Sequence, residues 1–172
     1  MVLKYITYLL IFFFAFQSEQ SLLELYEKKI TRELSVENVD QQLVLSNKVN
    51  RAYAYWEEYQ IGNQSDKQII VASIFTCNLG GCTAEQAYQK SKTSQEYFDI
   101  LLEFTDEKIS RLKVLQYFSD YGYEVVSKNY LKKYLGKTAC EFSNFNLEVD
   151  GISGATISVD ALQTFLGELC SG

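Results

Sequence analysis

The stretch Tyr97–Tyr117, YFDILLEFTDEKISRLKVLQY, decides the predicted fold of this chain. Two runs rich in aromatic and aliphatic residues, 97–104 and 109–117, flank the polar tetrapeptide Thr105–Lys108. This pattern is typical of a β-hairpin, and a similar run over Lys67–Cys77 predicts another strand. We therefore expect an α+β fold: a mostly antiparallel sheet with helices packed on one side or at its ends.

Three segments outside the hairpin have apolar residues at helical spacing. They predict an amphipathic helix over Ser21–Gln41, a second over Glu124–Leu135 with Gly136 as its C′ residue, and a last one over Ile157–Leu169. Residues 43–59 fit either a helix or a strand, and Gln60–Asp66 reads as a turn.

Three regions follow from this pattern. Residues 1–17 form a targeting segment, 18–60 an N-terminal helical region, and 61–172 the main domain. Within the main domain, Thr138–Asp150 is expected to be extended and to lead into the last helix. A connection over Asn78–Lys92 is expected to include a helical turn at Thr83–Lys90.

The charge and composition exclude some functions. A net charge of −6 and a pI near 4.8 disfavour a nucleic-acid partner, because an acidic surface repels phosphate backbones. The chain contains no histidine, which removes the commonest general base and metal ligand. No metal site is predicted.

The N-terminus has the features of an export segment. Lys4 precedes an uninterrupted apolar run from Tyr5 to Phe16, which has the length of a signal-peptide h-region and is short for a membrane span. A buried N-terminal helix or strand is the alternative. Small residues of a cleavage site are not evident around Ala15–Ser18. The segment is therefore a cleaved signal peptide or a membrane anchor, and either places the domain outside the cytoplasmic membrane.

Export would allow the four cysteines, Cys77, Cys82, Cys140 and Cys170, to be oxidised. Cys77 and Cys82 are five residues apart, and the intervening Asn78–Gly81 can turn so that the two thiols meet. Four buried thiols are the equal alternative. A metal site would need all four cysteines, and CxxxxC is not a zinc spacing.

The segment Ser153-Gly154-Ala155-Thr156 stands directly before the last predicted helix. A helix N-terminus offers unpaired N–H groups and partial positive charge, which suit a phosphate. Gly154 and Ala155 let the backbone approach a bulky anion, and Thr156 offers a hydroxyl. A serine or threonine at this position is also a common helix cap, so the tetrapeptide alone does not define a binding site.

The longer string Asp150–Ser158 resembles the D-x-x-S-G-A-T-x-S signature of the FMN-binding domain family. That family includes the FMN-carrying subunits of sodium-translocating NADH:quinone reductase and of Rnf complexes, and many small exported proteins. The resemblance implies that a flavin transferase joins FMN through its phosphate to Thr156. It implies that Asp150 belongs to the sequence read by the transferase. Ser153, Gly154, Ala155 and Ser158 would line the phosphate.

The resemblance extends upstream to about Ile69. It includes Ser91–Thr93, the hairpin, Tyr121–Glu124 and Tyr130–Lys137, and it implies that Glu124 belongs to the cofactor site. This chain departs from related sequences at one point, because they tend to carry Gly-Gly where it has Gly122-Tyr123.

These features predict an exported electron-transfer flavoprotein that is more an electron carrier than a stand-alone enzyme. Its partners would be the flavin transferase and redox donor and acceptor proteins, with a membrane contact if the N-terminal segment is retained. Two alternatives stay open. One is a flavin-dependent reductase of a small substrate, and the other is a secreted interaction domain in which Thr156 only caps a helix.

Overall fold

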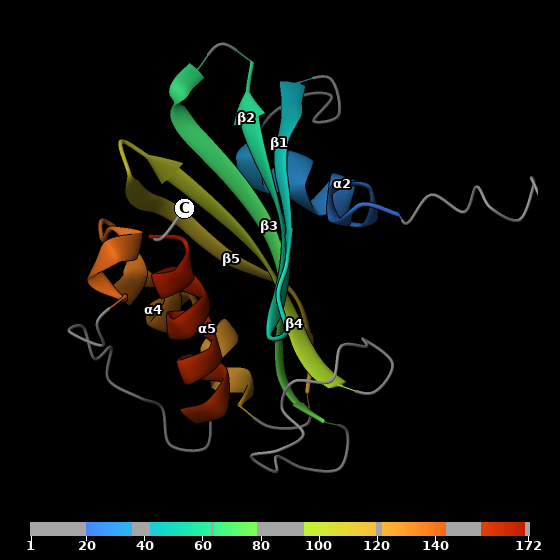
Figure 1. The fold of residues 1–172 in the computed structure, drawn as a ribbon, viewed down its shortest axis with the longest axis vertical. Coiled ribbons are helices and arrows are strands. Elements are labelled where there is room, and N and C mark those ends of the chain that lie inside the picture. Colours follow the sequence, from blue (N-terminus) through green and yellow to red (C-terminus); the bar gives the residue numbers. More distant parts are fainter. Residues whose placement is uncertain are drawn as a thin grey trace, which may run out of the picture.

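The computed structural model of the chain describes residues 20–35, 42–62, 64–78, 95–119, 122–143 and 156–170. Within these residues, five strands form one antiparallel sheet in chain order (Figure 1). Each strand pairs with its neighbours in the chain, so the sheet is a simple meander. The prediction of an α+β fold with an antiparallel sheet is confirmed. The strands are β1 (Leu43–Asn50), β2 (Ala54–Ile61), β3 (Gln64–Asn78), β4 (Gln95–Thr105) and β5 (Lys108–Phe118).

The predicted hairpin is β4 and β5, with Thr105 paired to Lys108. The loop is therefore shorter than the expected tetrapeptide. Asp106 and Glu107 form it alone, and both have left-handed backbone angles, φ 50° and 63°. Two consecutive left-handed residues match the right-handed twist of the flanking strands, which is why such turns close tight hairpins. The other predicted strand, Lys67–Cys77, is confirmed as part of β3.

The assignment of residues 18–60 to a helical region is wrong in its second part, where the strand alternative for 43–59 is the one observed. Residues 43–50 and 54–61 are strands of the same sheet as the hairpin. The predicted turn over Gln60–Asp66 is also shorter, because β2 continues to Ile61 and β3 begins at Gln64. Gly62 supplies the left-handed angle there, φ 48°.

Two helices occur where the sequence predicts them. Helix α2 (Leu22–Leu34) begins after Ser21, whose hydroxyl accepts a hydrogen bond from the Glu24 N–H. It ends before the predicted Gln41, since Ser35 is left-handed at φ 55°. Residues 36–41 and the predicted turn at Thr83–Lys90 lie outside the described residues. Helix α5 (Thr156–Glu168) matches the predicted last helix within one residue.

The predicted helix over Glu124–Leu135 is broken into three short pieces. These are η1 (Tyr123–Val126), α4 (Lys128–Leu131) and η2 (Lys132–Tyr134). Ser127 causes the first break because it is extended, with φ −67° and ψ 137°, and its hydroxyl caps α4 by accepting from the Tyr130 N–H. Gly136 is left-handed, as a C′ residue should be. The segment predicted to be extended after Thr138 begins instead with the 3-10 turn η3 (Ala139–Glu141).

Helices cover both faces of the sheet rather than one side. In Figure 1 α2 lies on one face, and α4 and α5 lie on the other. Alternate residues of β3 explain this arrangement: Ile69 and Val71 pack with α2, whereas Ile70, Ala72 and Ile74 pack with α5. All five side chains are almost fully buried. A strand that is apolar on both faces needs a covering layer on each.

A buried carboxylate anchors the start of α2. Glu57 of β2 is fully buried, and its Oε2 accepts hydrogen bonds from the Leu22 N–H at 2.9 Å and the Tyr59 hydroxyl at 2.6 Å. Its Oε1 accepts from the Tyr55 hydroxyl at 2.5 Å and lies 3.0 Å from Lys48 Nζ. The carboxylate thus compensates both the N–H groups at the helix start and a lysine charge.

The ionised form of Glu57 is favoured by these partners. Burial alone would raise the pKa of Glu57, but hydrogen bonds from Tyr55, Tyr59 and Lys48 outweigh burial and lower it. The same contacts act on Tyr59, whose pKa is raised well above its ordinary range by burial and by the bond to Glu57.

Two more carboxylates line the α2 side of the sheet. Asp99 of β4 is fully buried and accepts hydrogen bonds from the Tyr26 hydroxyl of α2 and, at 2.5 Å, from Ser73. Burial and the bond to Asp99 raise the pKa of Tyr26 well above its ordinary range. Near the end of α2, Arg111 joins Glu103 at 2.9 Å and also donates to the Glu33 carbonyl. Helix α2 is therefore fixed at its start, middle and end.

We expect Glu57→Gln to lower the free energy of unfolding by about 2–4 kcal/mol at neutral pH, because buried donors lose an ionised acceptor. Urea unfolding followed by circular dichroism measures this change. Folding lowers the pKa of Glu57 below its ordinary value of 4.5, so its stabilising effect is present above that pH and is lost as pH falls through the lowered pKa. The deficit of the variant should shrink accordingly in acid.

The matched control is Glu27→Gln, which removes an exposed carboxylate of the same helix and should change stability by less than about 0.5 kcal/mol. Equal, small effects of both substitutions would contradict the role assigned to Glu57.

Candidate cofactor-attachment site

Thr156 is the first residue of α5, and its side chain is exposed. No acidic residue lies in the first turn of this helix. The N–H groups and partial positive charge at the helix start are therefore not compensated by a carboxylate of that turn. Of the other predicted site residues, Asp150, Ser153, Gly154 and Ala155 lie outside the described residues.

Ser158 points the opposite way, toward the sheet. Its side chain is buried, and its Oγ lies 2.9 Å from the hydroxyl oxygen of Tyr117 on β5. Two residues along a helix correspond to a rotation of about 200°, so an exposed Thr156 and a buried Ser158 are expected together. Ser158 thus fixes the first turn of α5 to the end of β5, while Thr156 is accessible to solvent.

An aromatic pair adjoins this contact. The rings of Tyr117 and Tyr123 are 5.9 Å apart and nearly perpendicular, at 87°. On its other side Tyr117 stacks with Phe98, with centroids 5.9 Å apart and an interplanar angle of 29°. The amino-acid sequence alone does not predict that Tyr117 contacts both Tyr123 and Ser158.

Bulges in β5 made the face of its residues hard to predict. Simple alternation from Ile109 would place Arg111 and Lys113 on the α5 face. The register shift opposite Glu103/Phe104 puts Leu112 and Val114 there instead, and the shift opposite Asp99/Ile100 returns Tyr117 to that face. Each inserted residue reverses the alternation.

Glu124, the remaining predicted site residue, directly follows Tyr123 in η1, and its side chain is exposed. Val125 is fully buried and holds this short turn against the core. Among the described residues, the link from η1 toward the start of α5 runs through Tyr123 and Tyr117 and not through the Glu124 carboxylate.

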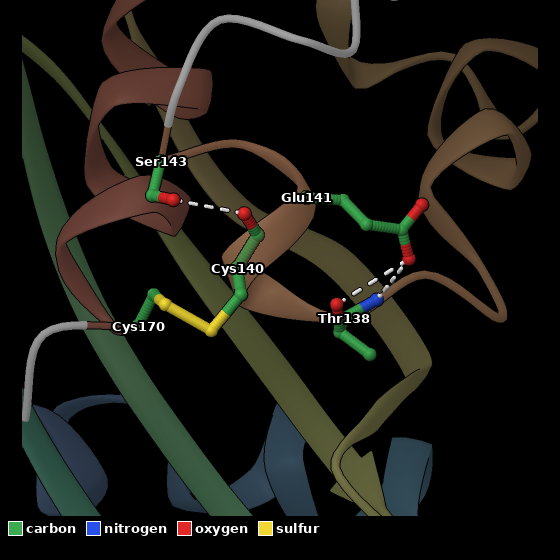
Figure 2. Close-up of a disulfide and its surroundings, with 5 residues drawn as sticks. All are labelled: Thr138, Cys140, Glu141, Ser143 and Cys170. Carbon is green, nitrogen blue, oxygen red and sulfur yellow. Dashed lines mark hydrogen bonds between the residues drawn. A yellow bond between two sulfur atoms is a disulfide. The ribbon is translucent and has the colours of Figure 1, made fainter.

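A disulfide joins Cys140 to Cys170, with the two Cα atoms 4.7 Å apart (Figure 2). It connects η3 to the end of α5. The backbone of η3 is held by a capping box in which the Thr138 N–H donates to Glu141 Oε1 at 2.8 Å. The alternatives of four buried thiols and of a four-cysteine metal site are therefore wrong. Cys82 and the side chain of Cys77 lie outside the described residues, so their pairing stays a prediction.

The covalent loop closed by this disulfide spans 30 residues and contains the whole string Asp150–Ser158. One end of the loop is η3, and the other is the end of α5. Aromatic packing also fixes α5 against the sheet, since the rings of Phe165 and Trp56 lie edge to face with centroids 5.5 Å apart. Gly167 allows close approach to η3: an added Cβ would lie 3.1 Å from the Phe142 carbonyl oxygen.

A groove of about 610 Å³ lies at the disulfide end of α5. It is lined by Trp56, Glu58, Glu107, Glu168 and Cys170, among others. A helix of this length is about 20 Å long, so the groove is far from Thr156. The predicted attachment residue and the groove are thus separate features.

No helix in the described part of the chain is long and apolar enough to cross a membrane. The predicted export segment, residues 1–17, lies outside that part. Comparison with protein-family models found no family that matches this chain. Comparisons with curated proteins and with solved structures also found no match.

We expect the double variant Cys140→Ser/Cys170→Ser to have a free energy of unfolding about 3–4 kcal/mol lower than that of the oxidised wild type. The disulfide removes the entropy of a 30-residue loop from the unfolded chain. Urea unfolding without reductant measures the difference. A loss under about 1 kcal/mol would show that the disulfide does not restrain the loop in this way.

Proposed function

We propose that this chain is an exported FMN-binding protein that carries FMN bound covalently through its phosphate to Thr156. It transfers electrons between a membrane or periplasmic donor and an acceptor that is not yet identified. The proposal starts from the resemblance of Asp150–Ser158 to the FMN-binding signature. It assigns Thr156 the phosphoester bond, and Ser153, Gly154 and Ala155 the lining of the phosphate.

The observation that carries the proposal is the exposed position of Thr156 at the start of a 13-residue helix. A transferase must reach the hydroxyl it modifies, and an exposed side chain meets this requirement. A phosphate held there lies near the unpaired N–H groups of the first turn, which stabilise an anion by about 0.3–1 kcal/mol at an exposed site. The absence of an acidic residue from that turn avoids charge repulsion.

The packing of α5 supports the same assignment. Val159, Leu162 and Leu166 are buried against the sheet, and Ser158 is bonded to Tyr117. A cofactor bound at the start of this helix would be attached to a rigid element. Fixed attachment is useful for a redox cofactor, because electron transfer depends on the position of its ring relative to a partner.

When bound, FMN supplies the redox chemistry, and the chain supplies its position and surroundings. The chain has no histidine to act as general base in a separate reaction. We therefore assign it the role of an electron carrier, with the flavin transferase and redox donor and acceptor proteins as partners. A signal peptide or anchor over residues 1–17 would place it outside the cytoplasmic membrane.

The direct test is peptide mass spectrometry of protein made in a host with an active flavin transferase. We expect the peptide containing Thr156 to carry one FMN, and Thr156→Ala to abolish the label, because the phosphoester needs that hydroxyl. The matched control is Thr164→Ala, which removes another exposed threonine of α5 and should leave the label intact.

Unlabelled wild type in a host that labels a known acceptor would refute the attachment and favour the interaction-domain alternative. Label that survives Thr156→Ala would place the flavin on another residue. Stopped-flow oxidation of the labelled protein by quinones and by thiols then separates a carrier from a reductase.

A further inference from the structure

Tyr123 is the most exposed of the large hydrophobic side chains in the described part of the chain, at 69%. Its exposure is fixed by the fold. Gly122 adopts φ 79°, an angle that favours glycine, and begins the η1 turn, while Val125 two residues later is fully buried. The turn is thus anchored on one side and presents the Tyr123 ring on the other.

Tyr117 gives the exposed ring a fixed partner. Its ring is held by stacking on Phe98, and its hydroxyl is held by Ser158. Tyr123 meets it at 87°, so the two rings form a right-angled corner. Edge-to-face geometry is a preferred arrangement of aromatic rings, and it leaves a face of Tyr123 free for a further aromatic group.

This corner contacts the first turn of α5, which begins at the predicted attachment residue Thr156. Ser158, bonded to Tyr117, is two residues after Thr156, which corresponds to a rise of about 3 Å along the helix. The ribityl phosphate chain of FMN holds the isoalloxazine ring away from the threonine oxygen. The ring would therefore pack on an apolar, planar surface that lies near the start of α5 but at some distance from Thr156.

We propose that the corner formed by Tyr117 and Tyr123 is the stacking surface for the isoalloxazine ring of FMN attached to Thr156. This inference rests on the proposed function and deepens it. Tyr123 supplies the ring face, and Tyr117 positions Tyr123 and ties it to α5 through Ser158. Tyr123 is then a cofactor-binding residue, and Tyr117 is a positioning residue.

Stacking on a tyrosine has a spectroscopic signature. A phenol in contact with an excited flavin gives it one electron, and the electron then returns, so the flavin relaxes without emitting light. Phenylalanine is much harder to oxidise and does not quench in this way, although it can stack. Ordered stacking also gives the flavin an induced circular dichroism signal in the visible region.

The experiment uses the full chain, with one covalent FMN confirmed by intact mass, as wild type and as Tyr123→Phe and Tyr123→Ala. We expect Tyr123→Phe to raise flavin fluorescence several-fold and to keep the visible circular dichroism. We expect Tyr123→Ala to raise the fluorescence and also to lose most of that signal. Both readouts are independent of activity.

The matched control is Phe118→Ala. Phe118 is another exposed aromatic of this region, 48% accessible, and it stacks with Tyr97 at 5.4 Å. The Phe118→Ala variant should leave the flavin fluorescence and the visible circular dichroism unchanged. Flavin-labelled Tyr123→Ala with wild-type fluorescence and dichroism would overturn the stacking surface while leaving the proposed function intact. Wild type without covalent flavin would overturn both.

Discussion

Strand β3 has apolar side chains on both faces, and the rest of the structure follows from covering them. Ile69 and Val71 face α2, and Ile70, Ala72 and Ile74 face α5. A sheet buried on one face could have kept its other face polar. Here each helix excludes water from one side of the same strand. The two helices are distant in sequence, but both pack on β3.

The two helices are held by different chemistry. Helix α2 is fixed by carboxylates of the sheet, with Glu57 at its start and Asp99 at its middle. Helix α5 is fixed by apolar packing along its length, by Ser158 at its start and by the disulfide of Cys170 after its end. The second arrangement keeps buried charge away from the start of α5, where a phosphate is proposed to bind.

The sequence predicted elements whose signal is local. The hairpin, strand β3 and the start of α2 all follow from short patterns of apolar and capping residues, as does α5 to within one residue. Residues 43–59 fit either a helix or a strand because Val49, Tyr53 and Trp56 recur at helical spacing, and the structure uses them in and around two strands. The break at Ser127 was missed because its neighbours continue a helical pattern.

Contacts between distant segments could not be predicted in this way. Cys140 and Cys170 are 30 residues apart, and spacing does not determine which cysteines pair. The Tyr117–Tyr123 corner depends on the docking of η1 against β5, which has no local signal. The motif alone suggests Thr156 as the attachment residue, whereas the contacts of Tyr117 with Tyr123 and Ser158 required the structure.

We propose that this chain carries one covalent FMN. The most direct measurement is the intact mass of the denatured protein, made in parallel in hosts with and without an active flavin transferase. We expect the transferase to add the mass of one FMN less one water to the wild type. Equal masses from the two hosts, with a known acceptor labelled in the first, would contradict it.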